Sequence, residues 1–185
     1  MLEADRLIFE KTINIYMLEI VKFISERMAP QNYDECLTIQ RGIKNGREYV
    51  KSIAVHINEQ QFKDQVGSSY KVNIKEKVIP IGDSNSNIFT KKYTYEIFNE
   101  NDETDYVRFD YMPYPTFPHL HINAYEQKWG NHLTYPESTN LDLVKLDVIK
   151  ALNIFQKYCH NPEDHILDQD KNAKYVSIIN GGKKH

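Results

Sequence analysis

Hydrophobic residues near the start of the chain recur with the period of an α-helix. The apolar side chains that define this stripe are Phe9, Ile13, Tyr16, Ile20 and Phe23. Spacings of three and four residues place side chains on one face of a helix. Pro30 disfavours helical backbone in the residue before it. We therefore expect an amphipathic N-terminal helix over residues 5–29.

The hydrophobic period changes to two in the middle of the chain, as is typical of strands with one buried face. Strands are expected near residues 35–42, 47–58, 69–79, 91–99, 105–112 and 118–126. Turn-forming residues such as Asn45-Gly46 and Asn99–Asp102 separate neighbouring segments. Short connections of this kind favour an antiparallel meander of about six strands over residues 35–126.

A second helical stripe follows the strands, and we expect a helix over residues 140–159. Thr139 and Asp142 match a capping box at its start, and Asn161-Pro162 ends it. The C-terminal arm, residues 160–185, is polar, and its segment Tyr175–Ile179 could add an edge strand or pack as an arm. The order of elements predicts one α+β domain over residues 1–185, with both helices packed on one face of the sheet and the other face open.

Composition and charge narrow the class of protein. The chain has 185 residues, 41% hydrophobic and 26% charged, as expected for a soluble globular domain. The formal net charge of -3 gives no global attraction to nucleic acid, although a local basic patch could still bind phosphate. Cys36 and Cys159 form no Cys-x-x-Cys pair, which favours a reducing cytoplasm over a disulfide framework. We expect no cofactor and, from the charged N-terminal segment, no membrane span.

The residues with the clearest chemistry lie in two alternating runs between Tyr106 and Asn123. Val107, Phe109, Tyr111, Leu120 and Ile122 would face the core. If the two runs are sheet neighbours, the polar side chains between these positions share the opposite face. That face would carry Arg108, Asp110, His119, His121 and Asn123.

This set of side chains suits general acid–base catalysis on a phosphodiester. His119 and His121 both titrate near neutral pH, so one could accept a proton while the other donates one. The guanidinium of Arg108 offers a two-pronged contact to phosphate oxygens. Asp110 would orient a histidine or pair with Arg108. Cleavage of RNA by its own 2′-hydroxyl needs little more than these groups.

Two other interpretations use the same residues. His119 and His121, joined by His132 or Asp110, could hold a catalytic zinc or manganese ion. Alternatively, the histidines are ordinary polar strand residues and Arg108 with Asp110 is a surface ion pair of small energetic value.

Further side chains could contact a substrate beside this cluster. Asn123, Trp129, His132 and Tyr135 lie on or near the same segment, and aromatic rings can stack on nucleobases. Lys75 belongs to the alternating run Lys71, Asn73, Lys75, Lys77, which could bind phosphates. The alternatives are aromatic packing within the sheet and a solvated strand face.

The segment around these residues resembles small bacterial toxins of the TumE type and larger related bacterial proteins. The resemblance covers about residues 91–123 and rests on Tyr93-Thr-Tyr-Glu, Arg108-Phe-Asp-Tyr and Phe117-Pro-His-Leu-His. In the TumE type an Arg-Tyr-Asp strand precedes a Pro-His-His-x-His segment. Leu120 stands where that segment has its inner histidine, and the two helices are additional.

The resemblance implies a toxin that acts on RNA and is neutralised by an antitoxin protein, with Arg108, Asp110, His119 and His121 in the matching positions. Our leading hypothesis is a cytoplasmic bacterial ribonuclease that needs no metal. A non-catalytic module that binds a nucleotide, RNA or a protein on the open sheet face is the second hypothesis, and a metal-dependent hydrolase is the third. A second copy of the chain could also cover this face.

Overall fold

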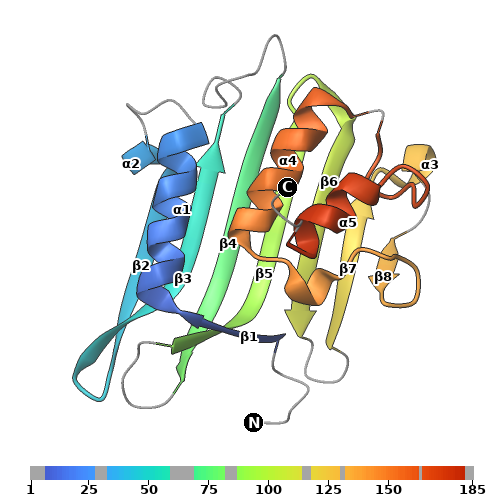
Figure 1. Ribbon diagram of the computed structural model, residues 1–185. Helices are drawn as coiled ribbons and strands as arrows, with labels where there is room; N and C mark the ends of the chain where they lie inside the picture. Colours follow the sequence, from blue (N-terminus) through green and yellow to red (C-terminus); the bar gives the residue numbers. More distant parts are fainter. Residues whose placement is uncertain are drawn as a thin grey trace.

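The computed structural model describes residues 7–27, 33–58, 69–81, 87–113, 118–129, 132–162 and 164–181. Within these ranges one antiparallel sheet carries the longer helices on a single side (Figure 1). The sheet follows a meander in which each strand pairs with the next: β2 (Leu37–Lys44), β3 (Arg47–Ile57), β4 (Tyr70–Ile81), β5 (Asn87–Asn99), β6 (Asp102–Pro113), β7 (Pro118–Ala124) and β8 (Leu133–Tyr135). The predicted α+β class and meander are confirmed.

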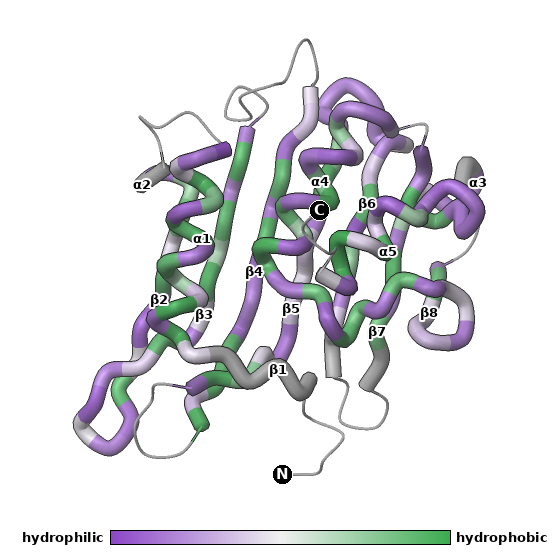
Figure 2. The backbone as a smooth tube through the Cα atoms, in the orientation of Figure 1, coloured by the Kyte–Doolittle hydropathy of each residue, from purple (hydrophilic) through white to green (hydrophobic). Residues whose placement is uncertain are grey.

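The strands bury one face because their apolar residues alternate with polar ones. In β4, Val72 and Ile74 are fully buried under the helices, whereas Lys75 and Lys77 are exposed on the other side. The same alternation of hydrophobic and hydrophilic residues runs through the middle strands in Figure 2. The helix-free face of the sheet is therefore polar, and we call it the open face.

The tight β2–β3 turn follows from its sequence. Asn45 and Gly46 both have positive φ angles, 52° and 72°. Two successive residues with positive φ match the twist of neighbouring strands, and Asn-Gly is the dipeptide that adopts this turn most readily. The turn fixes the register of the first hairpin, in which Lys44 pairs with Arg47.

The start of the predicted N-terminal helix is wrong. Leu7–Thr12 forms strand β1, and the helix α1 spans Ile13–Arg27. The edge of β5 explains the difference: β6 pairs with β5 only from Tyr93 onward, so the backbone of residues 87–90 is available to β1. Backbone hydrogen bonds to this edge outweigh a local helical preference. Residues 5, 6, 28 and 29 of the expected helix lie outside the described ranges.

The second predicted helix also begins too early. The helix α4 spans Val148–His160, and Asp147 caps it by accepting a hydrogen bond from the backbone N of Lys150 at 2.9 Å. The expected capping box does not form, because the hydroxyl of Thr139 accepts from the backbone N of Leu141 instead. A short 3-10 turn, η3 (Leu143–Lys145), precedes the helix. In this segment three buried leucines pack into the core: Leu141, Leu143 and Leu146.

The C-terminal segment is helical rather than an edge strand. The helix α5 spans Ala173–Ile179, and Tyr175 and Ile179, four residues apart, are both buried on its inner side. Two single-turn helices, α2 (Tyr33–Cys36) and α3 (Glu126–Trp129), complete the described elements. No helix in the described ranges is long and apolar enough to cross a membrane.

Two buried carboxylates tie the helices to the sheet. Asp105 accepts hydrogen bonds from the hydroxyl of Tyr158 at 2.6 Å and from the hydroxyl of Tyr70. Glu76 lies on the helix-covered face of β4 and accepts from Tyr16 of α1 at 2.7 Å. A buried carboxylate is stable only when such donors replace its water. Both carboxylates therefore stabilise the packing of helix on sheet, away from the open face.

Candidate active site

The register of β6 and β7 places the predicted polar residues next to one another. Asp110 lies directly opposite His121, and Arg108 lies directly opposite Asn123. Phe109 and Ile122 alternate with them and are fully buried beneath the helices. Four of the expected site residues therefore meet on the open face of two neighbouring strands.

Asp110 is the centre of this cluster. Its Oδ2 atom accepts from Nε of Arg108 at 2.7 Å and from Nδ2 of Asn123 at 2.7 Å. The same oxygen lies 3.3 Å from Nε2 of His121. The residue is only 3% exposed. Three nitrogen donors from two strands thus converge on one shielded carboxylate, which fixes the positions of all four side chains.

These donors keep Asp110 ionised. Burial alone would raise the pKa of its carboxyl group, because it penalises the charged form. The hydrogen bonds from His121, Arg108 and Thr94, with the positive charge of Arg108, outweigh burial and lower the pKa of Asp110 to about 2. At neutral pH the group is a carboxylate that only accepts hydrogen bonds.

The hydrogen bonds of Asn123 determine the tautomer of His132. Asn123 donates its Nδ2 to the carboxylate of Asp110, so its Oδ1 is an acceptor. Nδ1 of His132 lies 2.8 Å from that oxygen and must therefore donate its proton. In the neutral ring, the lone pair then resides on Nε2. Asp110, Asn123 and His132 form a chain of hydrogen bonds that orients an exposed imidazole.

His121 and His132 form the histidine pair of this cluster. Their ring centroids are 4.1 Å apart and their planes are inclined by 32°. His121 is 8% exposed, whereas His132, which immediately precedes β8, is exposed to solvent. The inner imidazole is held by Asp110 and the outer imidazole by Asn123. Two imidazole rings therefore lie against each other on the open face, the inner one buried and the outer one exposed.

The other predicted site residues differ in position. The side chains of His119 and Trp129 lie outside the described residues, although the backbone of His119 pairs with Met112 at the end of β7. Tyr135 pairs with Leu120 and packs against the core on the helix-covered face, where its hydroxyl hydrogen-bonds to Asp142. Tyr135 is therefore not on the same face as the histidines.

Lys75 lies on the open face, in the same cross-strand row as the cluster. The registers pair Lys75 with Thr94, Thr94 with Asp110 and Asp110 with His121. Neighbouring strands are about 4.8 Å apart, so Lys75 and Asp110 are separated by about 10 Å of backbone. The long lysine side chain can span much of that distance.

Two further lysines extend this basic surface. Lys77 of β4 lies directly opposite Lys92 of β5. Like charges in direct cross-strand positions repel each other. Within the described residues, neither lysine forms an ion pair with a carboxylate. Lys75, Lys77 and Lys92 therefore make a positively charged strip, which we call the lysine strip, on the part of the open face beside the cluster.

The described side chains do not form a metal centre. Among them, no group of three or more His, Cys, Asp or Glu residues is arranged to hold a metal ion. Nδ1 of His132 is engaged by Asn123, and Nε2 of His121 faces Asp110. The expected ligand set also includes His119, whose side chain lies outside the described residues.

Sequence reasoning missed the contribution of β5 to this site. The hydroxyl of Thr94 hydrogen-bonds to Asp110, and Glu96 lies directly opposite Arg108. The polar residues Lys92, Thr94 and Glu96 alternate with buried Tyr93 and Tyr95, which is the signal that could have revealed them.

No family model, curated protein or solved structure matches this chain.

Proposed function

We propose that the protein is a metal-independent ribonuclease whose histidine pair acts on a phosphodiester bound to the open face. The hydrogen-bond chain from Asp110 through Asn123 to His132 is the observation that carries this proposal. It presents an exposed imidazole in a single tautomer, with the basic nitrogen on Nε2, as a general base requires.

The residues have distinct roles in this reaction. Nε2 of His132 removes the proton of a ribose 2′-hydroxyl, and the 2′-oxygen attacks the adjacent phosphorus. The bond from phosphorus to the 5′-oxygen breaks, and the leaving oxygen takes a proton from a second histidine. The acid is one of the two histidines expected from the sequence, His119 or His121. Nε2 of His121 faces Asp110 and its Nδ1 is buried, so His121 can donate only if its ring turns out of the network. The products are a 2′,3′-cyclic phosphate and a 5′-hydroxyl end.

Arg108 is the group that suits the phosphate. Its Nε is committed to Asp110, whereas its side chain remains 40% exposed. A guanidinium held through Nε still has two terminal nitrogens, which can contact two phosphate oxygens and stabilise the charge that develops during attack. Asp110 thus positions Arg108 as well as the histidines.

The lysine strip supports RNA as the substrate class. An extended polyanion that crosses the open face from Arg108 would pass Lys75, Lys77 and Lys92, and would relieve the repulsion between the last two. A net charge of -3 makes this local concentration of positive charge stand out from the rest of the chain. Affinity for RNA should accordingly fall as salt concentration rises.

We further propose a bacterial toxin role, in the cytoplasm, with an antitoxin that covers the open face. An acidic antitoxin segment would compete with RNA for Arg108 and the lysine strip. A second copy of this chain is the alternative partner for the same face.

The second candidate function is a binding module without turnover. The burial of His121 favours it, because a ring that is 8% exposed resembles a structural member of a satisfied polar network. The two functions are separated by an assay that measures RNA binding and RNA cleavage with the same protein. Loss of cleavage with retained binding in His132→Ala supports the enzyme. Binding without cleavage in the native protein supports the module.

A further inference from the structure

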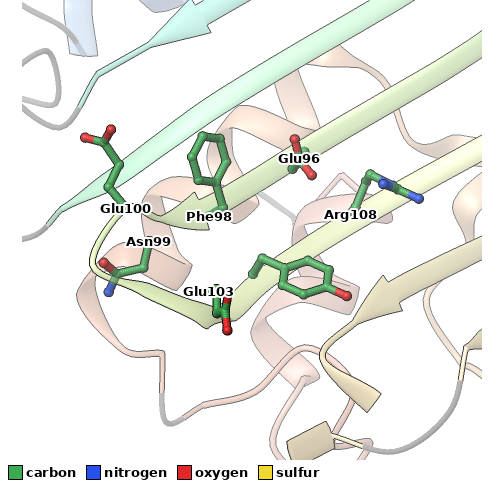
Figure 3. Close-up of a pocket in the computed structure, with 7 residues that line it drawn as sticks. Glu96, Phe98, Asn99, Glu100, Glu103 and Arg108 are labelled. Carbon is green, nitrogen blue, oxygen red and sulfur yellow. The ribbon is translucent and has the colours of Figure 1, made fainter. Parts of the chain in front are cut away.

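A hollow of about 480 Å³ adjoins the cluster at the end of the β5–β6 hairpin. Figure 3 shows the side chains around it, with Glu96 located between Phe98 and Arg108. The residues that line it are Glu96, Phe98, Asn99, Glu100, Glu103, Tyr106 and Arg108. Arg108 also donates to Asp110, so the side chain of Arg108 belongs both to the hollow and to the cluster.

Two aromatic residues line the hollow. Phe98 and Tyr106 are directly opposite each other in the register of β5 and β6, and both are half-buried. They belong to the open face, where large rings gain little from the core. Within the described residues, neither ring stacks on another aromatic side chain. A planar ligand can therefore use these rings as a stacking surface.

Glu96 supplies the polar group beside these rings. It lies opposite Arg108, yet the guanidinium turns along its own strand to Asp110 at 2.7 Å. Within the described residues, no ion pair connects Glu96 to a cation. Its two carboxylate oxygens are thus available, beside an aromatic surface, to a ligand that offers hydrogen-bond donors.

Guanine is the nucleobase that fits this combination best. Its N1–H and its 2-amino group lie side by side on the Watson–Crick edge, so that both can donate to one carboxylate. Adenine and cytosine present an amino group beside an acceptor nitrogen, and uracil presents one N–H between two carbonyl oxygens. Single-stranded RNA is commonly recognised in this manner, by stacking together with hydrogen bonds to the Watson–Crick edge.

We propose that the hollow is the base subsite of the RNA site and selects a guanosine on the 5′ side of the cleaved phosphate. This inference rests on the proposed ribonuclease function. Tyr106 and Arg108 are two residues apart on β6, a rise of about 6–7 Å. A base stacked at Phe98 and Tyr106 therefore has its 3′-phosphate near Arg108, with its ribose 2′-hydroxyl directed toward His132.

The test is a binding titration of the full chain with nucleoside 3′-monophosphates. Guanosine 3′-monophosphate should bind at least about tenfold more tightly than its adenosine, cytidine and uridine counterparts, because it alone forms two hydrogen bonds to a carboxylate. Inosine 3′-monophosphate lacks the 2-amino group and should fall between them. Equal affinities for all the nucleotides would overturn the inference without any need for a variant.

Two variants assign the effect to the hollow. Glu96→Gln should lower affinity for the guanosine nucleotide about tenfold and leave the other affinities within about twofold. Tyr106→Ala should weaken binding of every nucleotide, since stacking does not depend on the base. Glu126→Gln, which alters an exposed carboxylate on α3, is the matched control and should change nothing. A preference for guanosine that survives Glu96→Gln would also overturn the inference.

Binding and cleavage are read separately, so the two proposals can fail independently. Cleavage of RNA with no preference for the base refutes the guanosine subsite while the ribonuclease stands. Selective binding of guanosine 3′-monophosphate without any cleavage of RNA supports the subsite and refutes the ribonuclease.

Discussion

Asn123 and His132 are joined by a hydrogen bond of 2.8 Å, and the second hydrogen bond of Asn123, to Asp110, determines which of the two residues donates. Asn123 cannot turn its amide around, because its Nδ2 already donates to a carboxylate that only accepts. The imidazole must therefore donate from Nδ1. A half-buried side chain of β7 thus controls the protonation pattern of a histidine on the surface.

Replacing Asn123 tests its role as a positioning residue. Asn123→Leu removes both hydrogen bonds, so His132 loses its fixed tautomer and orientation. We expect kcat for RNA cleavage to fall about 10- to 100-fold. Because Arg108 still binds phosphate, KM should change less than kcat. Steady-state kinetics on a short RNA substrate measure both quantities, and a kcat equal to that of the native protein would contradict the positioning role.

Asp110 should make the stability of the fold sensitive to acid. Its pKa is lowered from 3.8 to about 2, so its contribution is present above about pH 4 and is lost as the pH falls toward 2. A shift of this size corresponds to about 2 kcal/mol. Asp110→Asn should therefore reduce the free energy of unfolding at pH 7 by about that amount and flatten the pH dependence between 4 and 2.

Urea unfolding of the native and Asp110→Asn proteins at several pH values tests this expectation. Asp170→Asn alters an exposed carboxylate and should change the free energy of unfolding by less than about 0.5 kcal/mol. Parallel curves for the native protein and Asp110→Asn across the range from pH 4 to pH 2 would show that Asp110 is not stabilised by its neighbours.

Because the carboxylate of Asp105 is buried, removing the tyrosine hydroxyl that donates to it should destabilise the fold. Tyr158→Phe deletes the donor that lies 2.6 Å from Oδ1 of Asp105 in the core. We expect the free energy of unfolding to fall by about 1–3 kcal/mol, because a buried charge loses a partner. Tyr125→Phe removes a hydroxyl from a partly exposed tyrosine and is the control. Equal stability of the two variants would mean that Asp105 does not depend on Tyr158.

A side chain added at Gly46 in the β2–β3 turn should change stability only through the conformation of the backbone. Gly46 has a φ of 72°, and a Cβ atom added there would meet no atom within 4 Å. Gly46→Ala should therefore destabilise the protein by about 1 kcal/mol through backbone strain alone. Lys44→Ala in the same hairpin should stay within about 0.5 kcal/mol. Thermal unfolding of both variants checks the comparison.

Part of this architecture could be predicted because strand alternation is a local property. The runs around Phe109 and Ile122 fix which side chains face the core, and the short connection between them makes the strands neighbours. Arg108, Asp110, His121 and Asn123 were therefore found together from sequence. A short apolar run such as Leu7–Thr12 fits both the helical and the strand period, and only the edge of β5 decides in favour of a strand.

The rest of the site depends on registers and loops that no short pattern encodes. The contact between Thr94 and Asp110 requires the register of β5 against β6, which the hairpin turn determines. His132 reaches His121 because the chain returns through β8, and the same return turns Tyr135 to the opposite face. The sequence indicates His119 and His121 as the histidine pair, but it does not show that the ring of His132 lies against that of His121.

The most direct test of the account is cleavage of labelled single-stranded RNA by the native protein and by His121→Ala/His132→Ala, each with and without a chelator. His160→Ala, which alters an exposed histidine at the end of α4, is the control, and labelled DNA tests the need for a 2′-hydroxyl. We predict chelator-resistant cleavage of RNA alone, with 2′,3′-cyclic phosphate ends, reduced at least about 100-fold in the double variant. Cleavage that is unchanged in the double variant, or that disappears with chelator in the native protein, would contradict the account.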